Sequence, residues 1–143
     1  MNLRHLSNED LHKQTQMRVS DERQMTSAVL HHLRENERRL LFAELGYSSL
    51  HEYCVKVLKY SESATYRRIS AMRILKDLPE IEEKLNAGEL SLSTVSQVQT
   101  HLRHSQKAGE KVDLKEKREL LHAIENLSSR QVGLGREKSS NGN

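Results

Sequence analysis

The chain contains one proline, Pro79, among its 143 residues, so most of its backbone lacks the residue that most often interrupts a helix. Residues that prefer strands are also scarce, because there is no tryptophan, one phenylalanine and four tyrosines, while helix formers are abundant. A sheet is therefore hard to place anywhere in the sequence. We predict an all-α fold, a multi-helix bundle, in a chain long enough for one domain with a modest core.

Serines that precede apolar residues at three- and four-residue spacing indicate where the helices begin. Ser7 precedes a predicted helix at 8–18, and Ser20 either caps a second helix at 21–35 or lies within one continuous helix. An apolar stretch then ends at Gly46, a natural helix stop. Two further helices are expected at 49–58 and 62–75. Three more follow: one ends at Gly88, one begins after the cap Ser91, and one begins after the cap Asp113.

These elements divide the chain into four parts. Long N-terminal helices form an arm at 1–46, a candidate for dimerisation, and a core at 47–104 holds the central helices and the short helices that follow. A polar linker and a C-terminal helix occupy 105–132. The tail at 133–143 consists largely of glycine, serine and asparagine, so we expect it to be disordered.

The basic residues are concentrated in one segment. The whole chain carries a net charge of +3, a mild excess that by itself says little about nucleic acid. Between Lys56 and Lys76, however, six basic residues stand against the single acidic Glu62, a net of +5, so the remainder of the chain is net acidic. A polyanion would be attracted to this segment rather than to the chain as a whole.

A helix-turn-helix is the interpretation that this segment favours. The first helix lies at 49–58, the turn at 59–61 and the second, arginine-bearing helix at 62–75. Hydroxyls and amides in the first turn of the second helix can reach phosphates, and arginine is well shaped for bidentate contact with guanine. We expect the arginines to point outward. The candidate DNA-contacting residues are Lys59, Ser61, Ser63, Thr65, Tyr66, Arg67, Arg68, Arg73 and Lys76.

Two other interpretations stay open on the residues alone. Three arginines on a surface helix are ordinary solvated positions, and a tyrosine at helical spacing usually packs its ring in the core. The N-terminal helices, roughly 8–45, can instead form an antiparallel pair or coil with a second copy, with charged residues interrupting their heptads. The alternative function is then a helical protein-interaction or dimerisation module without direct DNA contact.

Three spaced motifs, LGYSSLHEYC, YSESATYRRI and LPEIEEKLNAGELSLSTV, resemble the all-helical N-terminal domain found ahead of many bacterial HNH endonucleases. The resemblance covers about residues 7 to 132. The same core is also similar, over a shorter stretch, to the helix-turn-helix of ParB-type partition proteins, which implies double-stranded DNA as a partner. This second similarity is carried by Ser61, Ser63, Tyr66, Arg67, Leu78, Pro79, Gly88, Leu90 and Ser91.

The chain departs from the resembled family where the nuclease would follow. That nuclease has paired histidines, an asparagine and often CxxC pairs, whereas this chain has one cysteine, Cys54, and its eight histidines lie in no such context. We therefore expect no catalysis and no cofactor or metal. We interpret the chain as a non-catalytic DNA-binding module, a truncated paralogue or stand-alone remnant of an HNH endonuclease-like protein.

The remaining features concern location and the cysteine. No run approaches the roughly 18 apolar residues of a membrane span, and the N-terminus has no apolar signal core. We expect a cytoplasmic protein of bacterial type, associated with the nucleoid if it binds DNA. Cys54 falls at a core position of its helix, so we expect a buried thiol rather than a nucleophile.

Overall fold

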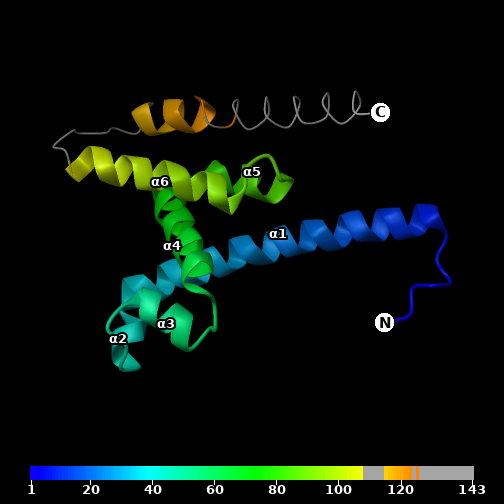
Figure 1. Cartoon of the computed structure of the whole chain (residues 1–143), viewed down its shortest axis with the longest axis horizontal. Helices are drawn as coiled ribbons and strands as arrows, with labels where there is room; N and C mark the ends of the chain where they lie inside the picture. Colours follow the sequence, from blue (N-terminus) through cyan, green and yellow to red (C-terminus); the bar gives the residue numbers. More distant parts are fainter. Residues whose placement is uncertain (108–114, 124, 126–143) are drawn as a thin grey trace, which may run out of the picture.

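A computed structural model describes residues 1–107, 115–123 and 125 of the protein (Figure 1). The described residues form helices with short connections and contain no strand, so the all-α prediction is confirmed. The predicted tail and much of the predicted linker lie outside these residues. No helix in the described part of the chain has both the length and the apolarity that a membrane span needs. The helices are α1 (Asn8–Arg39), α2 (Leu41–Glu44), α3 (Leu50–Lys56), α4 (Glu62–Asp77), α5 (Ile81–Ala87), α6 (Leu92–Lys107) and a further segment at 115–123.

Helix α1 runs for 32 residues without a break, so Ser20 lies inside one continuous helix and starts no second one. The predicted cap Ser7 is confirmed, because its hydroxyl accepts a hydrogen bond from the Asp10 amide at 3.1 Å. At the other end Leu40 adopts the left-handed conformation with a φ of 54°, and its amide donates to carbonyls of the last turn. The acidic residues in the first turn and the arginines in the last turn both interact favourably with the helix dipole.

Helix α4 is the centre of the fold. It begins after Ser61, whose hydroxyl accepts from the Ala64 amide at 3.1 Å, and it stops at Leu78, immediately before the proline. Figure 1 shows α4 crossing between α1 and α6. It packs against α1, α3 and α6, most extensively against α6. Its buried residues therefore occupy several faces of the helix, and they are Thr65, Ile69, Ser70, Ala71, Met72, Ile74 and Leu75.

The hydrophobic core gathers around α4. Leu30 enters it from α1, Cys54 from α3, and Val95 and Val98 from α6, all with no exposed surface. Burying a side chain of this size contributes about 1.5–3 kcal/mol relative to leaving it in water. The predicted buried thiol is confirmed, and burial raises the pKa of Cys54.

The further helical segment docks on the far end of α4 and on α5. Leu121 belongs to the core and is only 3% exposed. Lys117 pairs with Asp77 at 2.5 Å, and Arg118 pairs with Glu80 at 2.6 Å. The Arg118 contact is the main reason that the pKa of Glu80 is lowered. Apolar packing of Leu121 and these ion pairs therefore help to hold the segment in place.

The two halves of α1 have different surroundings. From Ser27 onward the helix packs against α4 and α5 and buries four side chains, those of Ser27, Leu30, Leu33 and Asn36. Before that point, residues 8–25 are exposed on every side except at the half-buried Ser20. Figure 1 shows this half, in blue, extending away from the other helices. We name residues 8–25 the arm.

Candidate nucleic-acid interface

Two helices form where the sequence predicts the two helices of the helix-turn-helix, and the second of them carries most of the basic segment. Helix α3 starts after Ser49, whose hydroxyl accepts from the Glu52 amide at 3.0 Å, and α4 starts after Ser61. Residues 57–61 join the two helices, which pack against each other. Within this connection Lys59 has a φ of 64°, the left-handed conformation that glycine adopts most readily. The chain therefore turns sharply between α3 and α4 without a glycine.

Most of the predicted DNA-contacting residues reach the surface, but Thr65 does not. It is fully buried, and its hydroxyl has no hydrogen-bond partner. It stands four residues before Ile69, so it lies on a face of α4 that carries core residues. The expectation that Thr65 contacts DNA is therefore corrected. Of the others, Arg67 and Arg68 are half-buried, and the exposed residues are Lys59, Ser61, Ser63, Tyr66, Arg73 and Lys76.

The three arginines of α4, which the sequence analysis expects to point outward, have different surroundings. The Arg68 guanidinium lies 4.4 Å from the centre of the Tyr60 ring and donates to a carbonyl of its own helix. Arg73 donates to Glu37 of α1 at 3.3 Å, and the two side chains are 44% and 38% exposed. Neither Arg67 nor Arg68 has a carboxylate partner among the described residues, and Arg67 also lacks a ring contact there. Tertiary packing thus gives each arginine a different environment.

A cleft opens on the side of α4 that carries Arg73. It has a volume of about 360 Å³, and three basic side chains line it, each from a different helix: His51 of α3, Arg73 of α4 and Arg103 of α6. Glu37 of α1 is the acidic residue of the lining. We name this space the α3–α4–α6 cleft. Its other lining residues are Phe42, Ser48, Ser49, Leu50, Tyr66, Ile69 and Ser70.

Tyr66 connects α4 to α6 at the cleft. Its hydroxyl hydrogen-bonds with Thr100, and this bond lowers the pKa of Tyr66 below its ordinary value. Ser70 and the nearby Arg103 lower the same pKa to a smaller extent. Because the ring is still 37% exposed, Tyr66 presents a fixed phenol at the surface beside a guanidinium.

The beginning of α3 is held by a capping network beside the cleft. Ser48 donates both its amide, at 2.9 Å, and its hydroxyl to the Glu52 carboxylate, and Lys56 donates to the same group at 2.8 Å. The Lys56 bond and then the Ser48 bonds lower the pKa of Glu52 to about 2. Since Lys56 balances Glu52 locally, Glu37 is the carboxylate that competes directly for the cations of the cleft.

Sequence reasoning identified Tyr66 and Arg73 at this cleft but missed His51 and Arg103. Both lie outside the basic segment from Lys56 to Lys76, and neither belongs to the predicted set of DNA-contacting residues. The packing of α6 on α4 places Arg103 at the cleft, and the position of α3 does the same for His51. No spacing rule within one helix could have found either residue.

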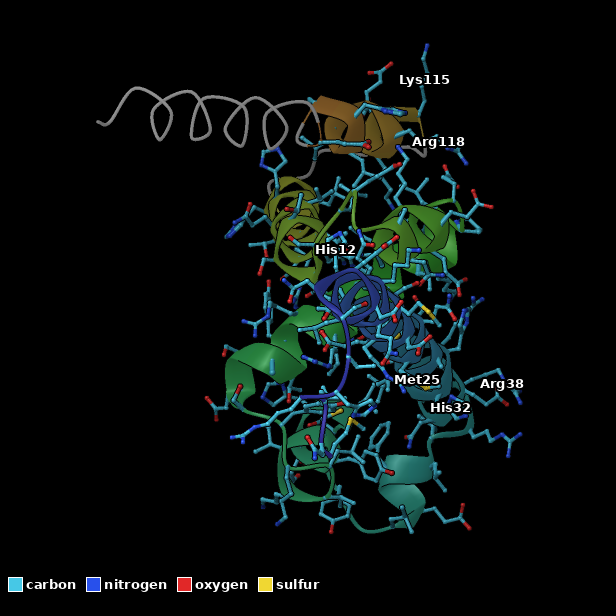
Figure 2. The ribbon with its side chains drawn as sticks, turned by 90° about the vertical axis from the view of Figure 1, so that its right-hand side faces the viewer. His12, Met25, His32, Arg38, Lys115 and Arg118 are labelled. Carbon is cyan, nitrogen blue, oxygen red and sulfur yellow. The ribbon has the colours of Figure 1, made fainter. Side chains whose placement is uncertain are left out.

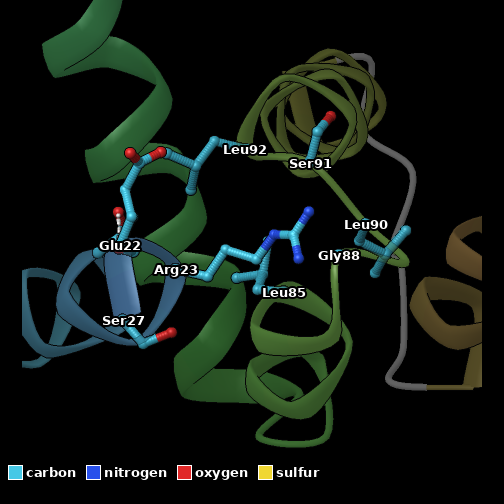
Figure 3. Close-up of a pocket in the computed structure, with 9 residues that line it drawn as sticks. Glu22, Arg23, Ser27, Leu85, Gly88, Leu90, Ser91 and Leu92 are labelled. Atoms are coloured by element: carbon cyan, nitrogen blue, oxygen red, sulfur yellow. Dashed lines mark hydrogen bonds between the residues drawn. The ribbon is translucent and has the colours of Figure 1, made fainter. Parts of the chain in front are cut away.

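A second cavity, of about 230 Å³, lies where the base of the arm meets α5 and α6 (Figure 3). Figure 3 shows the Arg23 guanidinium pointing into it, toward Gly88. A Cβ added to Gly88 would lie 2.6 Å from Arg23 Cζ, and the φ of Gly88 is 78°. Nearby, the Ser27 hydroxyl hydrogen-bonds with Asn86 at 2.6 Å. We assign these contacts to the attachment of α1 to α5.

Comparisons with known proteins add no assignment to these sites. No family model matches the chain, and neither does any curated protein or any solved structure. Within the described ranges, histidine, cysteine and acidic side chains form no group of three that could hold a metal ion. The candidate interface therefore rests on the geometry of the cleft.

Proposed function

We propose that this protein is a non-catalytic module that binds double-stranded DNA, and that the α3–α4–α6 cleft receives a phosphate of the DNA backbone. The observation that carries the proposal is the convergence of His51, Arg73 and Arg103 from three helices on one cleft. Guanidinium groups bind phosphate oxygens through paired, charge-assisted hydrogen bonds. The resemblance to HNH endonuclease N-terminal domains and to ParB-type helix-turn-helices supports the same partner.

The surface beside the cleft supports an extended contact. Ser63 and Arg67 lie within one turn of Tyr66, so they share its end of α4. The amides and hydroxyls at the start of α4 favour anions, because the helix dipole is positive there. In this proposal α3 and α4 act as a helix-turn-helix, and the first turns of α4 face the duplex. Arg67 and Lys59, which have no carboxylate partner in the described part of the chain, neutralise flanking phosphates.

The Arg73–Glu37 pair is a competitor that DNA can displace. Its 3.3 Å contact joins two side chains that are each more than a third exposed, and exposed pairs contribute only about 0.2–1 kcal/mol. A phosphate brings a full charge and several acceptor oxygens to the same guanidinium. Binding should therefore exchange the carboxylate for the phosphate.

The direct test is a titration of a fluorescent DNA duplex at several salt concentrations. Replacing Arg73 and Arg103 together with alanine should weaken binding and lower the slope of log affinity against log salt by about 1 for each lost phosphate contact. The matched control replaces Arg38 and Arg39 together with alanine. This change removes the same amount of charge, but from the exposed end of α1. Equal losses in the two double variants would show non-specific attraction and would rule out the cleft.

Neutralising the carboxylate of the cleft should have the opposite effect on DNA affinity. Glu37→Gln frees Arg73, so DNA affinity should rise by about 2- to 5-fold, the equivalent of one exposed ion pair. Circular dichroism of each variant checks that the fold is retained. Weaker binding by Glu37→Gln would contradict the proposed exchange at Arg73.

The alternative, a helical interaction module without DNA contact, is favoured by a separate observation. Within one chain the arm exposes all of its side chains except the half-buried Ser20. The nature of its partner is developed in the next section and does not depend on DNA binding.

A further inference from the structure

A line of side chains follows one face of α1 from the arm into the bundle. Residues at three- and four-residue spacing share a helix face, and this line extends over about 27 Å at 1.5 Å per residue. All of its members are exposed except the last, which is half-buried. We name it the α1 stripe, and it consists of Leu11, Thr15, Arg18, Glu22, Met25 and Val29.

Apolar side chains from other segments flank the stripe at both ends. Met1 and Leu3 line a cavity with the arm half of the stripe. The other end of the stripe borders another cavity, the second of the two beside it, which is lined by Tyr53, Leu58 and Tyr60. Figure 2 shows Met25 and His32, two residues of this second cavity, on the same side of α1. Exposed apolar side chains gathered at both ends of one helix face indicate an interaction site.

We propose that the α1 stripe is the interface between two copies of this chain, with their α1 helices antiparallel about a two-fold axis that passes between Arg18 and Glu22. The order of residues on the stripe is what points to a second copy. Apolar residues occupy its two ends, and one cation and one anion occupy its centre. In the antiparallel register Leu11 lies opposite the partner's Val29, so each apolar end meets an apolar end.

The central charges select both the symmetry and the direction. A two-fold axis places Arg18 opposite the partner's Glu22 and repeats the pair on the other side of the axis, which is the self-complementary contact of a symmetric dimer. A parallel arrangement would instead oppose two arginines and two glutamates. Within one chain Arg18 lies 3.8 Å from Asp21, and Glu22 has no ion pair among the described residues. The Arg18–Asp21 pair joins two exposed side chains, so a carboxylate of a partner can replace Asp21, and Glu22 has no pair within the described residues to give up.

The arm is the part of α1 that a partner would stabilise most. Helices without tertiary contacts are marginal in water at this length. The arm contains weak helix formers such as Thr15, Val19 and Ser20, and its Met25 side chain is 68% exposed. Pairing along the stripe would bury Met25 and Leu11 while leaving the α3–α4–α6 cleft on other helices.

Sedimentation velocity of the full chain over a range of concentrations tests the proposal. The parent should form dimers, and Arg18→Glu should raise the dimer dissociation constant by about tenfold or more, because like charges then face each other twice. The reversed pair, Arg18→Glu with Glu22→Arg, should restore dimers to near the parent level. Met17→Glu is the matched control, because this exposed residue lies about 120° around the helix from the stripe.

The outcomes separate the alternatives. A parent chain that stays monomeric at every concentration overturns the proposal, and so does a dimer that Arg18→Glu leaves intact. A charge reversal that fails to restore the dimer overturns the antiparallel register. Loss of dimers in Met17→Glu to the same extent as in Arg18→Glu also overturns it. Far-ultraviolet circular dichroism distinguishes a true loss of pairing from loss of the helix.

Discussion

The arm and the bundle half of α1 are parts of one unbroken helix in two environments. Leu30 is completely buried against the other helices, whereas Leu11 in the arm is 39% exposed. Apolar residues recur at helical spacing in both halves, so periodicity alone assigns both to an amphipathic helix. The comparison teaches that spacing creates an apolar face, while the elements that pack against it decide whether that face is core or interface.

Truncation of one leucine in each half gives the largest expected difference. Leu30→Ala should reduce the free energy of unfolding by about 2–5 kcal/mol, because it opens a cavity in the core. Leu11→Ala should cost less than about 1 kcal/mol in the monomer, because its side chain already contacts water. Urea denaturation at low protein concentration measures both. Similar losses would show that the arm is packed as tightly as the bundle.

A smaller effect concerns the junction between the halves. Gly88→Ala should cost about 1 kcal/mol or more, because a positive φ is strained for alanine and Arg23 must also move. Gly46→Ala is the matched control, since Gly46 has a φ of 95° but nothing within 4 Å of the added carbon. The excess cost at Gly88, measured by denaturant unfolding, isolates the Arg23 contact. No excess would mean that Arg23 does not help to hold the base of the arm.

The smallest effect concerns charge at the end of the bundle half. Hydrogen bonds from Arg38 and then Arg39 lower the pKa of Glu35 from 4.5 to about 2. The unfolded chain therefore binds this proton more readily, so the contribution of Glu35 is fully present above about pH 4.5 and is lost as the pH falls toward about 2. Glu35→Gln should flatten the fall in melting temperature across this range.

The matched control for Glu35 lies in the arm. Glu9→Gln removes a carboxylate that pairs with Lys13 on the solvent-exposed helix, at 3.1 Å. Thermal melts of both variants over the acid range, at low salt, give the comparison. Since the Glu35 side chain is 43% exposed, added salt should reduce its effect. An unchanged pH profile for Glu35→Gln would show that the two arginines do not stabilise the carboxylate in solution.

The candidate site was only partly predictable from sequence. The predicted helix-turn-helix identified Arg73 and Tyr66 as candidates, and both line the cleft. It also proposed Thr65, which the packing of α4 buries completely. It missed Arg103, because the contact of α6 with α4 joins residues that are distant along the chain. A local pattern therefore found the correct helix but could not sort its faces.

The sequence by itself determined the helices and several of their ends. The scarcity of proline leaves long stretches that can be helical. Ser7 and Ser61 cap α1 and α4, because a serine hydroxyl reaches an amide only three residues away. Only the tertiary structure decided which cations stay free. Glu37 reaches Arg73 across 36 residues of sequence, and such a partner is supplied by the crossing of two helices rather than by any neighbour along the chain.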